Sequence, residues 1–169
     1  PICMPTRMTW THGYYPSQVS DGLMHNWHAW PRWLDSCPRA LREAGYRTAL
    51  VGKLHCQGRW RNDLTDPAFV EETRLRGYDD VFETCGKSFA YWVDCEWTHH
   101  LARRGLLQRY REDLKRRVEQ LGGDEPADAS FLSAEDSMDG FIGRHARQWL
   151  QDYDDPRPFF LHASFCGPH

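Results

Sequence analysis

Five residues of the chain carry side chains that can attack a substrate, neutralise an anion or move a proton. Cys3 is a potential nucleophile, and Arg7 follows it by about one helical turn, so the two share one helix face. Lys53 offers a compact positive charge to an anion. His55 and His169 belong to the residue type that titrates near neutral pH, which suits proton transfer. Together these side chains predict chemistry on an anionic substrate.

A short helix and a buried strand lead into the glycine turn that carries the lysine and the first of these histidines. Ser36 as the N-cap and Gly45 as a left-handed stop predict a helix over residues 36–45. The apolar run at residues 48–51 then predicts a buried strand. The lysine and the histidine therefore come directly after a strand.

A second buried strand is predicted over residues 159–165, and His169 lies just beyond its carboxyl end. Open α/β sheets bind ligands outside the carboxyl ends of their strands. Lys53, His55 and His169 are therefore site candidates on position alone.

The rest of the chain supplies elements that cover such a sheet. They are a short strand over residues 78–84, a charged amphipathic helix over 99–121, a loop over 122–126 and a helix through residue 153 with a capping-box-like start at Ser133 and Asp136. Strands that alternate with helices predict an α/β fold with a largely parallel central sheet and helices on both faces. His145, on the apolar stripe of the last helix, is expected to be packed rather than to bind a ligand.

Composition narrows the class of protein. The 169 residues suffice for one domain with a core. With 21 Lys and Arg against 24 Asp and Glu, the net charge of −3 argues against nucleic-acid binding. The hydrophobic fraction of 40% and the charged fraction of 27% are typical of a folded globular chain. No run approaches the roughly 18 to 20 apolar residues that cross a bilayer.

The cysteines and aromatic residues are less decisive. No two of the six cysteines have the C-x-x-C spacing of a zinc site, and the five after Cys3 are expected to be small buried hydrophobes. Histidines and tryptophans gather in the first third of the chain, where they line a cleft or pack under a long loop; composition leaves both open. The candidates for shaping substrate choice there are His25, His28, Trp30 and Trp33.

Four segments resemble elements of the sulfatase family. C-M-P-T-R at residues 3–7, followed by a glycine and a Tyr-Pro pair, resembles the first signature, in which the cysteine of C-x-P-S/T-R is oxidised to formylglycine. Residues 45–55, G-Y-R-T-A-L-V-G-K-L-H, match the family's G-Y-x-T-x-x-x-G-K-x-H element at every defined position. Residues 77–82 are similar to its glycine, aromatic and acidic stretch, and residues 158–169 to its P-F-F-L-x-x-S-F-x-x-P-H strand. The resemblance implies an alkaline-phosphatase-like (sulfatase) fold.

The resemblance also implies roles for the five side chains. Cys3, as formylglycine, supplies the hydrate nucleophile and a metal ligand, and Arg7 holds the hydrate and braces the metal shell. Lys53 contacts sulfate oxygens, His55 helps to activate or collapse the hydrate, and His169 contacts the substrate. The implied activity is that of a sulfuric ester hydrolase, in which Ca²⁺ or another divalent cation acts as a Lewis acid.

The chain departs from the family pattern in several places. Met4 replaces a small or polar residue, and His12 replaces Thr or Ser. Of two roles for His12, contact with the substrate or capping of the first helix's carboxyl end, we expect the second. Neither the family's amino-terminal aspartate pair nor its downstream Asp/Asn pair, which together bind the metal, is present. Residues 1–169 are therefore expected to be part of a single sulfatase catalytic domain, truncated at both ends and lacking the first strand and the C-terminal portion. The isolated segment is expected to be inactive, with the remaining metal ligands outside it.

Two alternatives stay open. A phosphonate or phosphate monoester hydrolase of the same superfamily would use the same charges on another tetrahedral anion. A catalytically inactive binding module would keep Cys3 as a thiol. The expected partners are a small-molecule or carbohydrate sulfate ester and, during maturation, a formylglycine-generating enzyme, with no nucleic acid and no membrane span. The sequence leaves the compartment open between periplasmic, extracellular and cytoplasmic.

Overall fold

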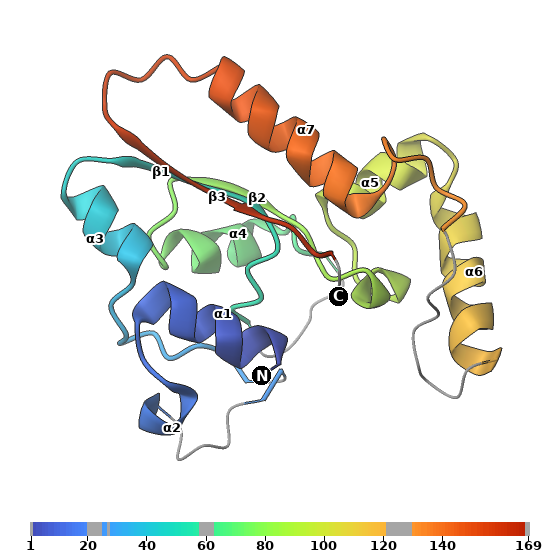
Figure 1. The fold of residues 1–169 in the computed structure, drawn as a ribbon, viewed down its shortest axis with the longest axis horizontal. Coiled ribbons are helices and arrows are strands. Elements are labelled where there is room, and N and C mark those ends of the chain that lie inside the picture. The colour runs from blue at the N-terminus through green and yellow to red at the C-terminus, as the bar shows by residue number, and fades with distance from the viewer. Residues whose placement is uncertain (1, 20–24, 27, 58–62, 121–129, 168–169) are drawn as a thin grey trace.

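A three-stranded parallel sheet forms the centre of the fold, with helices on both faces (Figure 1). The computed structural model describes residues 2–19, 25–26, 28–57, 63–120 and 130–167. The strands are β1 (Arg47–Gly52), β2 (Asp80–Glu83) and β3 (Phe159–Ser164), in the order β2-β1-β3. The parallel α/β class and all three predicted strands are confirmed.

The carboxyl ends of the three strands meet at one edge of the sheet. Gly52 at the end of β1 lies opposite Glu83 of β2 and Ser164 of β3. A Cβ atom at Gly52, whose φ is 115°, would lie 2.1 Å from the carbonyl oxygen of Ser164. Only glycine therefore allows β1 and β3 to approach this closely where the chain turns out of the sheet.

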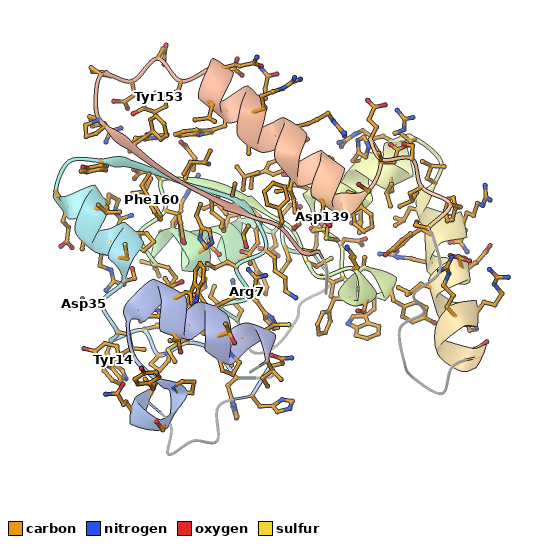
Figure 2. The ribbon with its side chains drawn as sticks, viewed as in Figure 1. Arg7, Tyr14, Asp35, Asp139, Tyr153 and Phe160 are labelled. Carbon is orange, nitrogen blue, oxygen red and sulfur yellow. The ribbon has the colours of Figure 1, made fainter. Side chains whose placement is uncertain are left out.

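One face of the sheet is covered by α1 (Cys3–His12), next to which lie the short helix α2 (Pro16–Val19) and α3 (Cys37–Glu43). Met4 and Met8 of α1 are fully buried against Leu50 of β1 and Phe160 of β3. Figure 2 shows Arg7 reaching from the same helix toward the sheet. The helix thus presents both apolar and charged side chains to the sheet.

The predicted N-cap of α3 is confirmed by its hydrogen bonds. The Ser36 hydroxyl accepts a hydrogen bond from the backbone N–H of Arg39 at 3.2 Å and donates to the carbonyl of Arg76 at 2.5 Å. The helix ends before Gly45, which adopts a φ of 91°. The left-handed stop therefore lies where the sequence places it.

The opposite face is covered by α7 (Met138–Gln151), which packs Phe141 and Ile142 onto the sheet. Its N-cap is Ser137, whose hydroxyl accepts from the backbone N–H of Gly140. The predicted start at Ser133 is therefore too early, because Ser133 and Asp136 hydrogen-bond to each other in the turn before the helix.

The helix predicted over residues 99–121 is two helices, α5 (Glu96–Arg103) and α6 (Leu107–Gln120). Gly105 separates them with a φ of 68°, a conformation that ends a helix. The charged amphipathic pattern continues through both helices and conceals the break. The predicted loop over residues 122–126 lies outside the described residues.

Three helices were not predicted, namely the short α2 described above and two more. In α4 (Pro67–Arg74), which packs beside β2, Asp66 is the N-cap and accepts from the backbone N–H of Ala68 at 2.8 Å. The 3-10 helix η1 (Ser88–Tyr91) contacts α6. The Asp-Pro pair before α4 was an available signal for this start that the sequence prediction did not use.

Four of the five later cysteines are buried as predicted, but Cys37, the first residue of α3, is exposed. His145 stacks on Phe82 with ring centroids 4.2 Å apart, in agreement with the prediction of a packed histidine. Trp30 is 1% exposed and belongs to the core, whereas Trp33 is 71% exposed.

Across the described ranges, every helix is too short or too polar to cross a membrane.

Candidate active site

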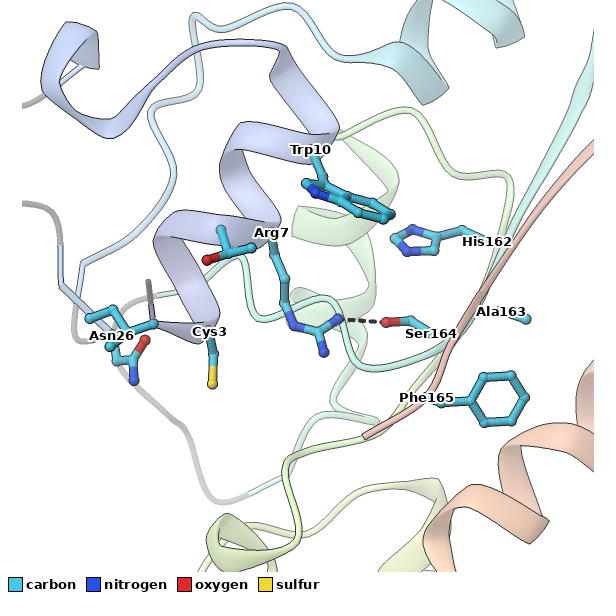
Figure 3. Close-up of a pocket in the computed structure, with 10 residues that line it drawn as sticks. Cys3, Arg7, Trp10, Asn26, His162, Ala163, Ser164 and Phe165 are labelled. Atoms are coloured by element: carbon cyan, nitrogen blue, oxygen red, sulfur yellow. Dashed lines mark hydrogen bonds between the residues drawn. The ribbon is translucent and has the colours of Figure 1, made fainter. Parts of the chain in front are cut away.

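A cavity of about 560 Å³ opens between α1 and the carboxyl end of β3 (Figure 3). Cys3, Arg7 and Trp10 line it from the helix, and His162 and Ser164 line it from the strand. This volume lies in the range of ordinary small-molecule sites. The structure therefore brings the predicted nucleophile and its neighbouring arginine to one cavity.

Cys3 is the first residue of α1 and is half-buried. The N-cap residue Ile2 has extended backbone and no side chain that accepts a hydrogen bond. The backbone N–H of Met4 instead donates to the Oδ1 atom of Asn26 at 3.0 Å. The partial positive charge of the helix N-terminus therefore lies beside Cys3, where it favours a bound anion.

Arg7 joins α1 to the carboxyl ends of two strands. Its Nη1 atom donates to the carbonyl oxygen of Lys53 at 2.6 Å and to the Oγ atom of Ser164 at 2.5 Å (Figure 3). Charge-assisted hydrogen bonds of this kind are stronger than neutral ones. Arg7 therefore holds the turn after β1 and the end of β3 against the helix that carries the nucleophile.

Lys53 and His55 lie in the turn after β1 and are almost completely buried, with 2% and 1% of their surface exposed. The Lys53 backbone N–H donates to the carbonyl of Ser164 at 3.1 Å, and its ammonium lies 5.8 Å from the centre of the Phe89 ring. Neither side chain lines the cavity beside Cys3. Both side chains therefore lie outside the cavity wall, and Arg7 contacts this turn at the Lys53 carbonyl.

The tautomer of His55 follows from its hydrogen bond. The Nε2 atom lies 3.2 Å from the carbonyl oxygen of Asn26, which can only accept, so Nε2 carries the proton. Burial, followed by the positive charges of Lys53 and Arg7, lowers the pKa of His55 to about 3. The imidazole is therefore neutral at pH 7, with Nδ1 as its acceptor. Asn26 also binds the N-terminus of α1, so this one residue links the imidazole to the helix of Cys3.

His162, which the sequence analysis did not select, faces the cavity from β3. Its Nδ1 atom lies 2.8 Å from the hydroxyl of Tyr78. Burial and then the charge of Arg7 lower the pKa of His162 to about 4, and burial raises the pKa of the Tyr78 phenol. Both groups are therefore neutral at pH 7. The available signal was the alternation of a strand, which puts residues 160, 162 and 164 on one face.

Asp139 at the start of α7 holds the chain that follows β3. Its Oδ1 atom accepts from the backbone N–H groups of Cys166 and Gly167 at 2.7 and 3.0 Å, and its Oδ2 atom pairs with Lys87 at 3.2 Å. These bonds fix the segment that leads toward His169. His169 itself lies outside the described residues, so its predicted role stays a prediction.

His12 does not cap the end of α1, contrary to the prediction. His12 lies in the last turn of α1, but its Nδ1 atom donates to the carbonyl of Asp35 at 2.7 Å instead of capping the helix. Gly13 caps α1 through its N–H to Thr9.

Within the part of the chain that the structure describes, no group of three or more His, Cys, Asp or Glu side chains could hold a metal ion. The described residues alone do not fit a metal site, and the location of further ligands stays a prediction.

Comparisons with known proteins agree with this architecture. The family model "Sulfatase" matches residues 1–169. A choline-sulfatase of Rhizobium meliloti (strain 1021) is 26% identical over 175 residues, which cover 100% of this chain and 29% of that protein. Phosphonate monoester hydrolases from Silicibacter pomeroyi and Agrobacterium radiobacter superpose with TM-scores of 0.63 and 0.59, each at 23% identity. Each superposition covers 100% of this chain and 32% of the other.

These matches involve the whole of the chain but under a third of the relative's length and about a third of each solved structure. The structural likeness, at low identity, shows that the fold is shared: a parallel sheet with helices, as in the alkaline-phosphatase-like fold. The family match covers all residues, including both segments that carry Cys3 and Lys53. The chain therefore belongs to the sulfatase family.

Proposed function

We propose that the full-length protein hydrolyses a sulfate ester and that its nucleophile is formylglycine made from Cys3. The observation that carries this proposal is the placement of Cys3 at the N-terminus of α1, beside a cavity, with Arg7 bonded to the turn of Lys53 and to Ser164. The relationship to a choline-sulfatase supports sulfate as the group that is removed.

Anion binding is the first task of the site. The N-terminal end of α1 and the guanidinium of Arg7 supply positive charge to one cavity, and the buried Lys53 belongs to the turn that Arg7 contacts. A sulfate ester is a tetrahedral anion, whose oxygens need such charge both on binding and as the bond to the leaving group breaks. The same charges attract the substrate and stabilise the departing sulfate.

Oxidation of Cys3 to formylglycine would supply an aldehyde hydrate. One hydroxyl would attack sulfur and displace the alcohol, and the second would lose a proton, re-form the aldehyde and expel sulfate. The resemblance to the sulfatase family assigns that proton to His55, whose neutral imidazole has Nδ1 as an acceptor. Asn26 fixes this tautomer and keeps the ring near the start of α1. Arg7 would orient the hydrate, and His169 would contact the substrate.

Ca²⁺ or another divalent cation belongs to the proposal as a cofactor of the full-length protein. Cys3, as formylglycine, is the ligand that this chain would contribute. Because the described residues form no metal site by themselves, no catalytic step is assigned to the cation. A formylglycine-generating enzyme is the proposed partner in maturation, and a small-molecule or carbohydrate sulfate ester is the proposed substrate.

Mass spectrometry of the full-length protein tests the nucleophile. Conversion of Cys3 to formylglycine lowers the mass of its peptide by roughly 18 Da. The modified protein is expected to release sulfate from an aryl sulfate, and Cys3→Ala is expected to abolish turnover. An active protein that carries only the unmodified thiol would refute the mechanism. An unmodified and inactive protein would favour a binding module.

A phosphonate monoester is the second candidate substrate, because two phosphonate monoester hydrolases share the fold. Their likeness concerns the fold alone, and the same charges in the cavity suit either anion. Comparison of kcat/KM for an aryl sulfate and an aryl phosphonate with the same leaving group separates the two. We expect the sulfate to be preferred, and a preference for the phosphonate would replace the proposed substrate class.

A further inference from the structure

The turn after β1 holds His55 in an unusual backbone conformation. Its φ is 63°, and among the described residues it is the one non-glycine residue with a positive φ. The left-handed region is unfavourable for a residue with a Cβ atom, so the surrounding structure must enforce it. Such enforced conformations concentrate at functional sites, and here one sets the direction of an imidazole.

The carboxylate of Glu83 supplies much of this enforcement. Glu83 is the last residue of β2, and its Oε1 atom accepts from the backbone N–H of His55 at 3.1 Å. The carboxylate therefore holds the backbone of the turn from the neighbouring strand.

Glu83 is in turn held from a helix. Thr73 of α4, which is fully buried, donates from its hydroxyl to the Oε2 atom of Glu83 at 2.9 Å. Glu83 itself is 8% exposed. Burial raises the pKa of its carboxyl against the opposing effect of these hydrogen bonds. Burial of an acid between Thr73 and the turn is costly, and a purely structural role does not require it.

The contacts of Glu83 are with the backbone of the turn and with Thr73, while the ring of His55 faces Asn26 on its other side. Glu83 does not line the cavity. Any effect of Glu83 on the reaction must therefore pass through the position of the turn and its side chains.

We propose that Glu83 is a positioning residue that fixes the left-handed turn at His55 and thereby directs its imidazole toward Asn26 and the start of α1. This inference rests on the proposed function, since it assigns Glu83 to the proton-transfer group of that site. Displacement of a catalytic group by about 1 Å can lower a rate by about 100-fold. Removal of the carboxylate is expected to lower kcat to that extent and to leave KM within about threefold, because His55 is not proposed to bind the ground state.

A double-mutant cycle in the full-length, formylglycine-containing protein tests the proposal. Glu83→Ala and His55→Ala are each expected to lower kcat by about 100-fold, and the double variant to resemble His55→Ala alone. Glu83→Gln keeps an oxygen that accepts from the His55 N–H, and we expect it to retain kcat within about fivefold. The matched control is Asp136→Asn, which alters another buried carboxylate that faces His100 and Arg104, far from the turn in sequence.

Thermal unfolding of each variant separates positioning from simple destabilisation. Asp136→Asn is expected to lower the melting temperature without changing kcat. If Glu83→Ala does not fold, Thr73→Val replaces it in the cycle, because it removes the donor that holds Glu83. Losses in kcat that multiply in the double variant, or an unchanged kcat in Glu83→Ala, would overturn the inference while the protein remained a sulfatase. Failure of the proposed function itself would appear instead as no sulfate release by the wild-type, formylglycine-containing protein.

Discussion

The two faces of the sheet are built from the same three strands but carry different chemistry. On the α7 face, Val51, Phe82 and Leu161 pack against Phe141 and Ile142 in a continuous apolar cluster. The α1 face begins in the same way, with Leu50 and Phe160 among its buried or packed residues, but it becomes polar toward the carboxyl edge of the sheet. Because side chains alternate along a strand, one sheet can stabilise the fold on one face and hold a reactive site on the other.

The cysteines show the same division. Cys85, Cys95 and Cys166 belong to the apolar cluster on the α7 side, with the sulfur atoms of Cys85 and Cys95 3.5 Å apart. The hydrogen bond with Cys95, followed by burial, raises the pKa of the Cys85 thiol, and burial raises that of Cys166, so both stay protonated. Cys3, in contrast, is half-buried at a helix N-terminus and lines the cavity. Burial and helix position, rather than residue type, distinguish the candidate nucleophile from the packing cysteines.

Truncation of Phe141 on the α7 face gives the largest expected effect on stability. Phe141 is 1% exposed and contacts the rings of Phe82, His100 and His145. Phe141→Ala is expected to lower the free energy of unfolding by about 3–5 kcal/mol, which urea unfolding measures. The kcat of the remaining folded protein is expected to stay unchanged. A large fall in kcat at unchanged stability would contradict the division between the faces; Phe141→Leu is the conservative control.

Substitution of Arg7 on the α1 face is expected to lower activity more than stability. Arg7→Lys keeps the charge but loses the planar group that reaches both Lys53 and Ser164, so kcat/KM is expected to fall by about 100-fold. The free energy of unfolding is expected to fall by about 1.5 kcal/mol, the contribution of one hydrogen bond to a charged group and less than in Phe141→Ala. Because the arginine also belongs to the C-x-P-x-R motif, the rate is divided by the formylglycine content measured by mass spectrometry. Full activity per modified molecule would show that a positive charge at position 7 is sufficient for catalysis without the planar guanidinium.

The sequence predicts the segments near the site better than it predicts the periphery. The strand over residues 48–51 and the glycine turn have strong local signals and are found with their boundaries shifted by at most one residue. The helix over residues 99–121 is in fact divided at Gly105, since an amphipathic pattern does not reveal whether a glycine adopts a positive φ. Local signals therefore identify an element more reliably than its ends.

The residues of the candidate site also differ in how well the sequence predicts their positions. Cys3 and Arg7 share a helix face, and spacing along one helix is sufficient to predict that. Glu83 and Ser164 reach the turn through the register of three strands, which places both opposite Gly52. That register depends on tertiary packing and is not encoded in any one segment. The supporting hydrogen bonds therefore required the structure.

Ser164 is expected to contribute less than Arg7. Ser164→Ala removes one of the two acceptors of Nη1 but leaves the carbonyl of Lys53, so the arginine keeps its position with more freedom. We expect kcat/KM to fall by about tenfold, which corresponds to one hydrogen bond with a charged group. Steady-state kinetics with an aryl sulfate measure this. A loss as large as that of Arg7→Lys would indicate that Ser164 has a role beyond holding the arginine.

A pH dependence of stability, rather than a loss of activity, is expected from His162 on the α1 face. Its pKa is lowered to about 4 in the folded protein, below the ordinary value of histidine. As the pH falls below about 6.5, the unfolded chain binds a proton that the folded protein does not, so stability is lost toward the folded pKa. His162→Gln removes this contribution, and the fall in unfolding free energy between pH 7 and pH 5 is expected to be smaller by about 2 kcal/mol. Phe141→Leu serves as the control, because it alters the α7 face without removing a titrating group, and an equal change in pH dependence there would refute the assignment to His162.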